Sequence, residues 1–226
     1  MTRRTNARIA GFTFLAYIAA GMTSMMLFAR ATSGEGVAAR LASIAQNTTD
    51  IRLTILLGLL MNLSALVLAV TLYAITREQD HDLAMLGLTC RVAEGIAGMD
   101  VSRTLGLLWL ATAAGTAAPE AGASATLGAF LLKMGDTWVA TATFFAVGST
   151  LFSWLLLRGR MIPIALACLG VLASILLVLC LPLQLAGLLG GPVTSFIWLP
   201  MLLFEVALAL WLILKGVVAP VPRQHA

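Results

Sequence analysis

An arginine and two glutamates lie within segments of this sequence that are otherwise almost wholly apolar. Arg91 and Glu94 are one helical turn apart, and Glu205 lies in a separate apolar segment near the C-terminus. Charged side chains are costly in the hydrocarbon core of a bilayer, so within a membrane span they face protein or water and mark a functional site or a structural ion pair. These three residues and Asn62, an amide in a third apolar segment, are the candidate site residues.

The chemistry open to this set is proton or cation binding. The guanidinium of Arg91 keeps its charge in nearly any environment and needs an acidic partner. Since two carboxylates face one guanidinium, the carboxylate that Arg91 does not engage would be able to hold a proton. In this interpretation Glu205 is the titrating group, Arg91 is its counter-charge and Asn62 is a hydrogen-bonding neighbour. In the alternative, Arg91 and Glu94 are a purely structural buried pair and Glu205 completes their network.

Other kinds of reactive site find little support in the sequence. His81 and His225 both lie outside the apolar segments, so no histidine can pair with a serine or bind a metal within them. The three cysteines have no C-x-x-C or His-paired spacing. No P-loop and no dinucleotide fingerprint is present. The sequence therefore predicts no catalytic residue, no metal site and no cofactor, and we expect a protein that is not an enzyme.

The composition is typical of a membrane protein. Hydrophobic residues make up 60% of the 226 and charged residues 11%, whereas soluble domains are about half apolar and about a quarter charged. The mean hydropathy is +0.98. The basic residues form no patch with interleaved aromatic residues of the kind that binds nucleic acid. We therefore expect one membrane domain over residues 1–226 that has the lipid bilayer, and no nucleic acid, as its partner.

Six apolar segments are long enough to cross a bilayer as helices, which takes about 20 residues. They span residues 9–29, 53–75, 83–110, 137–157, 161–182 and 195–214. The third is the least regular, because it carries Arg91, Glu94 and the closely spaced glycines Gly95 and Gly98. Long runs rich in Leu and Ala favour helices over strands. We expect an all-α integral membrane bundle of six transmembrane helices, with a small surface helix over residues 36–46.

The four candidate site residues fall at similar depths. With a rise of 1.5 Å per residue, Arg91, Glu94, Glu205 and Asn62 lie about 12 to 16 Å from the start of their segments. This places all four in the middle third of a hydrocarbon core about 30 Å thick. Pro200, five residues before Glu205, predicts a kink in the last segment. The shared depth predicts a charged cluster at the midplane of the bundle.

The distribution of Lys and Arg predicts the orientation of the chain. With the N-terminus inside, eight of these residues lie on the cytoplasmic side and four on the other, with Arg91 and Arg103 left in the third segment. This bias follows the positive-inside rule and places both termini in the cytoplasm. The apolar region of a cleaved signal peptide has about 7 to 15 residues. The first apolar segment is longer, so we expect it to remain as a span.

Several motifs together carry a resemblance to a known family. They are the opening ARIAG at 7–11, Arg91-x-x-Glu94, FFAVGSTLF at 144–152 followed by Ile162-Pro163, and EVALALWLILKGV at 205–217. In order and spacing the chain resembles the bacterial multi-pass family catalogued as domain of unknown function 4386 (DUF4386). The resemblance implies an integral protein of the bacterial inner membrane with about six spans. It brings no catalytic residues to carry over.

Two functional hypotheses follow from these observations. In the first, the bundle binds a proton, an ion or a small amphiphile at the level of Arg91, Glu94 and Glu205. In the second, the chain is an interaction or assembly protein whose buried ion pairs are structural, and its partner is another membrane protein or a second copy of the chain. The sequence leaves both open.

Overall fold

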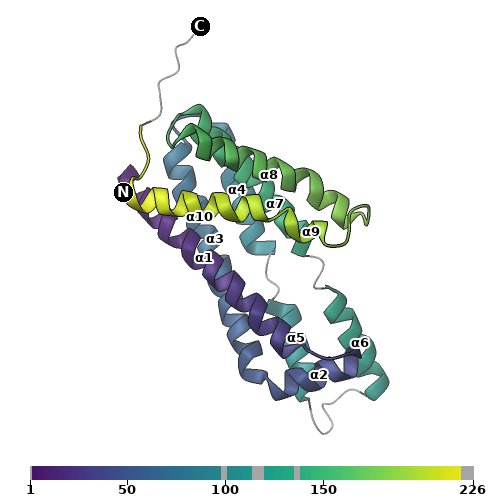
Figure 1. Cartoon of the computed structure of the whole chain (residues 1–226). Helices are drawn as coiled ribbons and strands as arrows, with labels where there is room; N and C mark the ends of the chain where they lie inside the picture. Colours follow the sequence, from purple (N-terminus) through teal and green to yellow (C-terminus); the bar gives the residue numbers. More distant parts are fainter. Residues whose placement is uncertain (1, 98–100, 114–119, 135–137, 220–226) are drawn as a thin grey trace. The chain divides into compact units, whose positions relative to one another are not determined.

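The computed structural model describes residues 2–97, 101–113, 120–134 and 138–219. These residues form ten helices and no strand, which confirms the all-α prediction. The helices are α1 (Arg3–Ala31), α2 (Gly36–Gln46), α3 (Thr48–Thr76), α4 (His81–Ala97), α5 (Val101–Thr112), α6 (Ala121–Lys133), α7 (Trp138–Arg158), α8 (Ile164–Leu185), α9 (Val193–Phe196) and α10 (Leu199–Leu214), as labelled in Figure 1.

Five segments among these residues are long and apolar enough to cross a membrane. They are Arg3–Ala31, Thr48–Thr76, Gly122–Arg158 (of which residues 135–137 lie outside the described residues), Ile164–Leu185 and Val193–Leu214. These segments identify the chain as a membrane protein. The predicted third span at 83–110 corresponds to α4 and α5, which have 17 and 12 residues. Residues 98–100 between them lie outside the described residues, so a sixth crossing stays a prediction.

By their contacts the helices group into two compact units. Unit 1 comprises Met1–Tyr17, Leu63–Ala97 and Val139–Ala226, and unit 2 comprises Ile18–Asn62 and Gly98–Trp138. The long helices α1 and α3 each contribute one part to unit 1 and the other to unit 2. The prediction of a single membrane domain over 1–226 stays a prediction.

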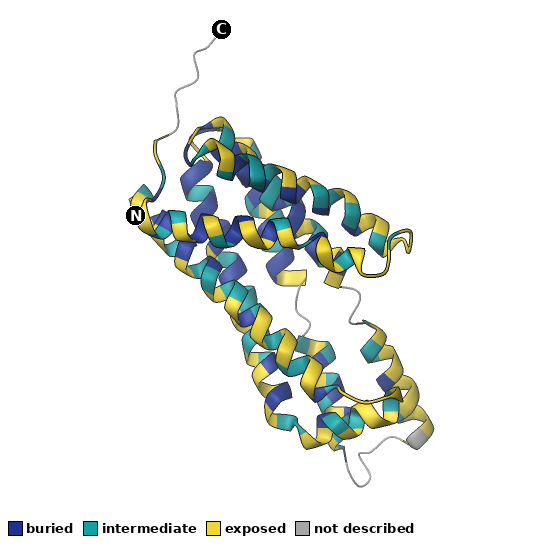
Figure 2. Cartoon of the chain, in the orientation of Figure 1, coloured by how far each residue is buried: buried dark blue, intermediate teal, exposed yellow. Residues whose placement is uncertain are grey.

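Unit 1 is held together by close approach of its helices. In Figure 1, α10 lies alongside α8. A Cβ atom added at Gly170 of α8 would lie 2.4 Å from the ring of Phe204 on α10, so this glycine makes room for the aromatic side chain. Figure 2 shows buried and exposed residues alternating along α10, as expected of a helix with one face in the core.

The last apolar run is divided where the sequence predicted a kink. It forms the short helix α9 and then α10, and Pro200 lies in the first turn of α10. Backbone N–H groups in the first turn of a helix have no acceptor within the helix. Proline, which lacks this N–H group, is therefore tolerated there. The predicted kink is thus a break between two helices, and α10 begins one residue before the proline.

The outward surface of unit 1 is apolar while part of its interior is polar. Leu172 and Leu179 on α8 are 68% and 62% exposed, and Leu203 on α10 is 65% exposed. Arg91, in contrast, is 1% exposed. In a soluble protein an apolar surface of this kind would promote aggregation. In a bilayer it is the surface that lipid chains cover.

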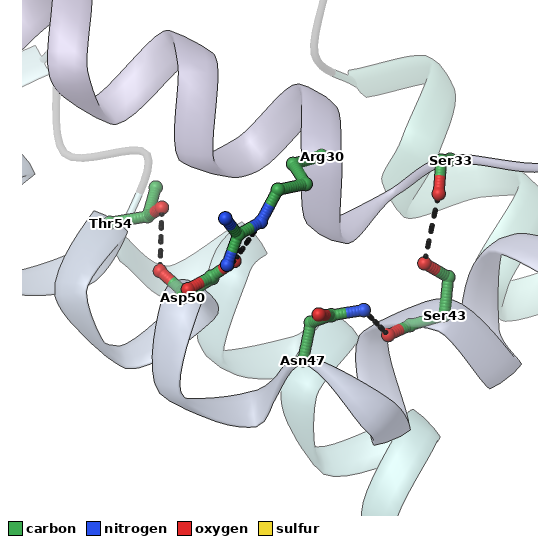
Figure 3. A network of polar contacts seen from close by, with 6 residues as sticks. All are labelled: Arg30, Ser33, Ser43, Asn47, Asp50 and Thr54. Carbon is green, nitrogen blue, oxygen red and sulfur yellow. Dashed lines mark hydrogen bonds and ion pairs between the residues drawn. The ribbon is translucent and has the colours of Figure 1, made fainter.

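In unit 2, polar contacts join the end of α1 to the start of α3 (Figure 3). The Arg30 side chain forms an ion pair with Asp50, with Nε donating to Oδ2 at 2.8 Å. The hydroxyls of Ser33 and Ser43 lie 3.2 Å apart, and Asn47 Nδ2 donates to the carbonyl of Ser43 at 2.9 Å. These contacts link the segments on either side of α2, which packs against α5 and α6. The surface helix predicted over 36–46 is confirmed as α2.

The packing of α1 in unit 1 gives a first prediction. A Cβ at Gly11 would lie 2.7 Å from the carbonyl oxygen of Ala209 and 2.7 Å from Cγ1 of Ile213. Gly11→Ala should therefore push α1 away from α10 and lower the free energy of unfolding by about 1 to 3 kcal/mol, as overpacking usually does. Thermal unfolding in mild detergent measures the effect. The matched control is Gly58→Ala, because a Cβ there would meet its neighbour at an ordinary 3.9 Å. Equal melting temperatures for the two variants would contradict this description of the packing.

Candidate functional site

Helix α4 carries two of the predicted site residues on its buried face. Arg91 and Glu94 are both buried, together with Gly87 and Gly95 on the same helix. The aliphatic part of Arg91 passes close to α7, since a Cβ at Gly148 would lie 3.0 Å from Arg91 Cγ. Small residues let two helices approach closely in a membrane. Here the missing side chain at Gly148 leaves the space that the arginine occupies.

The guanidinium of Arg91 lies between a carboxylate and two aromatic rings. Its Nη1 is 2.8 Å from Oε2 of Glu94, which is an ion pair within one helical turn. Its central carbon is 4.8 Å from the ring centre of Phe145 and 6.0 Å from that of Tyr17. Aromatic faces attract a cation at these distances, and more strongly when water is excluded.

Tyr17 also contacts the carboxylate of the pair. Its hydroxyl donates a hydrogen bond to Oε1 of Glu94 at 3.0 Å, linking α1 to α4. The sequence analysis missed this residue. A signal was available, because Tyr17 lies about 12 Å into the first apolar segment, which is the depth of the other polar groups. Its hydroxyl would need a polar partner at that depth.

Glu205 approaches the pair from α10. It is 6% exposed and lies within electrostatic range of both Arg91 and Glu94. Its Oε1 atom is buried and has no hydrogen-bond partner among the described residues. The structure thus brings Arg91, Glu94 and Glu205 together inside unit 1, although only the first two are close in sequence.

A small cavity adjoins this charged cluster, defined here as Arg91, Glu94, Glu205 and Tyr17. Its polar wall is formed by Arg91, Glu205 and two serines of α7, Ser149 and Ser153. Apolar side chains of α1, α3, α7 and α10 form the rest. The centre of a water molecule has about 10 Å³ of free space there. The cavity is too small for an organic ligand, because this free space is about what one water molecule needs.

Asn62 belongs to the other unit. It is the last residue of unit 2 on α3, and its side-chain nitrogen is buried without a hydrogen-bond partner among the described residues. Its membership of the binding site stays a prediction.

A comparison with protein families matches residues 9–216 to the family described as domain of unknown function (DUF4386). The chain belongs to the DUF4386 family. The resemblance drawn from the sequence motifs is thereby confirmed at the level of the family. Comparisons with curated proteins and with solved structures gave no match. All four members of the charged cluster in this DUF4386 chain lie within the matched residues.

The geometry of the charged cluster predicts how it responds to the loss of Arg91. Arg91→Met removes the only cation of the cluster and leaves two buried carboxylates without a counter-charge. Removing one partner of a buried ion pair typically lowers the free energy of unfolding by about 3 to 5 kcal/mol. We expect a loss of this size for Arg91→Met, measured by unfolding in detergent.

The double variant Arg91→Met/Glu94→Gln tests whether the loss comes from the unpaired charge. Glutamine keeps the size of Glu94 and can still accept the hydrogen bond from Tyr17. The double variant should therefore be more stable than Arg91→Met alone. If the two substitutions are simply additive, the ion pair does not make the energetic contribution described here.

Proposed function

We propose that this DUF4386 protein is a multi-pass protein of the bacterial inner membrane that binds a proton at Glu205, with Arg91 and Glu94 as the fixed charges of the site. It acts without catalysing a reaction and without a cofactor. It has six spans and both termini in the cytoplasm, and the lipid bilayer is its main partner.

The observation that carries the proposal is the charge balance of the buried cluster. One guanidinium lies among two carboxylates, and Arg91, Glu94 and Glu205 are 1%, 6% and 6% exposed. An uncompensated charge in a low-dielectric interior is strongly unfavourable. With both carboxylates ionised, the cluster would carry one excess negative charge. A proton on one of them restores neutrality.

The partners of the two glutamates favour Glu205 as the residue that carries the proton. Glu94 already has two compensating contacts, the guanidinium of Arg91 and the hydroxyl of Tyr17. Both favour a carboxylate there. Oε1 of Glu205 has no hydrogen-bond partner among the described residues. The proton is therefore best held on α10.

The size and charge of the cavity favour a proton over the other ligands considered. An amphiphile does not fit into space for the centre of one water molecule, about 10 Å³. A metal ion in the cavity would be repelled by the guanidinium in the cavity wall, because Arg91 cannot lose its charge. A proton needs no additional volume.

Infrared spectroscopy tests the protonation of Glu205 directly. A buried carboxylic acid has a C=O stretching band that a carboxylate lacks. We expect such a band in the wild-type protein in liposomes, with an intensity that falls at high pH. Glu205→Gln should remove it, while the control Glu35→Gln, at an exposed position before α2, should leave it unchanged.

Two results would contradict the proposal. One is a spectrum without a carboxylic acid band at any pH at which the protein remains folded. The other is a band that survives in Glu205→Gln and disappears in Glu94→Gln. If Glu205→Gln only destabilises the fold and no property of the wild type depends on pH, the alternative gains. The chain would then be a membrane interaction protein with a structural charged cluster, whose partner is another membrane protein or a second copy.

A further inference from the structure

The guanidinium of Arg91 has more hydrogen-bonding capacity than the described residues use. A guanidinium carries five N–H donors. Its Nε and Nη2 have no hydrogen-bond acceptor among the described residues, and its Nη1 has only the ion-pair contact with Glu94, although the side chain is 1% exposed. Buried polar groups in folded proteins nearly always have a partner, which is either protein or ordered water. The unused donors therefore require an acceptor that another side chain does not supply.

Glu205 has a buried acceptor without a hydrogen-bond donor among the described residues. Its Oε1 atom is buried and unpartnered, and both Glu205 and Arg91 line the same small cavity. The hydroxyls of Ser149 and Ser153 belong to the same wall, four residues apart on one face of α7. The cavity is thus bordered by the donors of Arg91, the acceptor of Glu205 and two serine hydroxyls that can donate or accept a hydrogen bond.

The volume of the cavity limits which molecule can bind in it. A cavity holds one water molecule when it offers about 10 to 15 Å³ to the centre of that molecule and two to four polar partners. This cavity offers about 10 Å³ and four polar side chains. The guanidinium repels a metal cation, and the two carboxylates of the cluster repel an anion. A neutral molecule of the size of water satisfies both conditions.

We infer that one ordered water molecule occupies this cavity and bridges Arg91 to Glu205. The water accepts a hydrogen bond from the guanidinium and bonds to Oε1 of Glu205, and the hydroxyls of Ser149 and Ser153 provide its remaining partners. It joins the cation on α4 to the carboxyl on α10, which lack a direct hydrogen bond. It also gives Glu205 a neighbour with which to exchange a proton. The inference concerns the site of the proposed function but holds whether or not Glu205 carries a proton.

Solid-state NMR of the full chain in lipid bilayers tests this inference. With ¹⁵N-labelled arginine, magnetisation is transferred from water to the side-chain nitrogens of Arg91. The expected result for the wild type is a transfer signal at the Arg91 side chain, which is otherwise shielded from solvent.

The variant Ser149→Thr tests the location of the water. It keeps the hydroxyl and adds one methyl group to the cavity wall, which leaves no room for the water, so the transfer signal at Arg91 should be lost. Ser102→Thr is the matched control, since it makes the same change at an exposed position of α5 and should retain the signal.

Two outcomes would overturn the inference. One is the absence of transfer from water to Arg91 in the folded wild-type protein, and the other is a signal of unchanged intensity in Ser149→Thr. Neither outcome bears on the proton at Glu205, which the infrared band reports independently. A missing water signal with an intact carboxylic acid band would overturn only the inference, and the reverse pattern would overturn only the proposed function.

Discussion

The interior of unit 1 is organised around a cation that cannot be neutralised. Arg91 is almost completely buried, and a guanidinium keeps its proton in any protein environment. The fold must therefore supply negative charge and polarisable surface around it. It does so with Glu94 on the same helix, with the rings of Phe145 and Tyr17, and with Gly148, where the lack of a side chain leaves space for the arginine stem.

The two carboxylates of the charged cluster differ in how they reach the cation. Glu94 lies three residues from Arg91, so any regular helix over this segment brings them together. Glu205 comes from α10, and its position depends on how α10 packs in unit 1. Glu94 is thus a local partner of Arg91 within one helix. Glu205 is a neighbour from a distant segment, and its protonation state depends on how the helices pack. This asymmetry is the reason why the proposed proton is assigned to Glu205 and not to Glu94.

Polar contacts in the two units serve different purposes. In unit 2 they lie at helix ends, where Arg30 is largely exposed and pairs with Asp50 across the connection through α2. Such pairs are close to water and contribute modestly to stability. In unit 1 the contacts of the charged cluster are in the interior beneath an apolar surface. The same residue types therefore affect stability much more there, because no water is present to solvate an unpaired charge.

Much of the local structure could be predicted from the sequence. The apolar runs predicted helices at α1, α3, α7, α8 and α10, the short helix α2 was expected at 36–46, and the motifs identified the family. These features depend on composition and on periodicity along one segment, which are local properties. The shared depth of Arg91, Glu94 and Glu205 could also be counted from the sequence, because the rise of a helix per residue is constant.

Only the tertiary structure decided which side chains face one another. The hydrogen bond from Tyr17 to Glu94, the ring of Phe145 at the guanidinium and the serines of the cavity wall all join separate helices. Depth along a helix leaves its rotation and its neighbours open, and those are set by the packing of complete surfaces, including glycines such as Gly148 and Gly170. The sequence by itself determined that charges lie deep among apolar helices. Packing decided their partners, because contacts between distant segments depend on the shapes of all the helices at once.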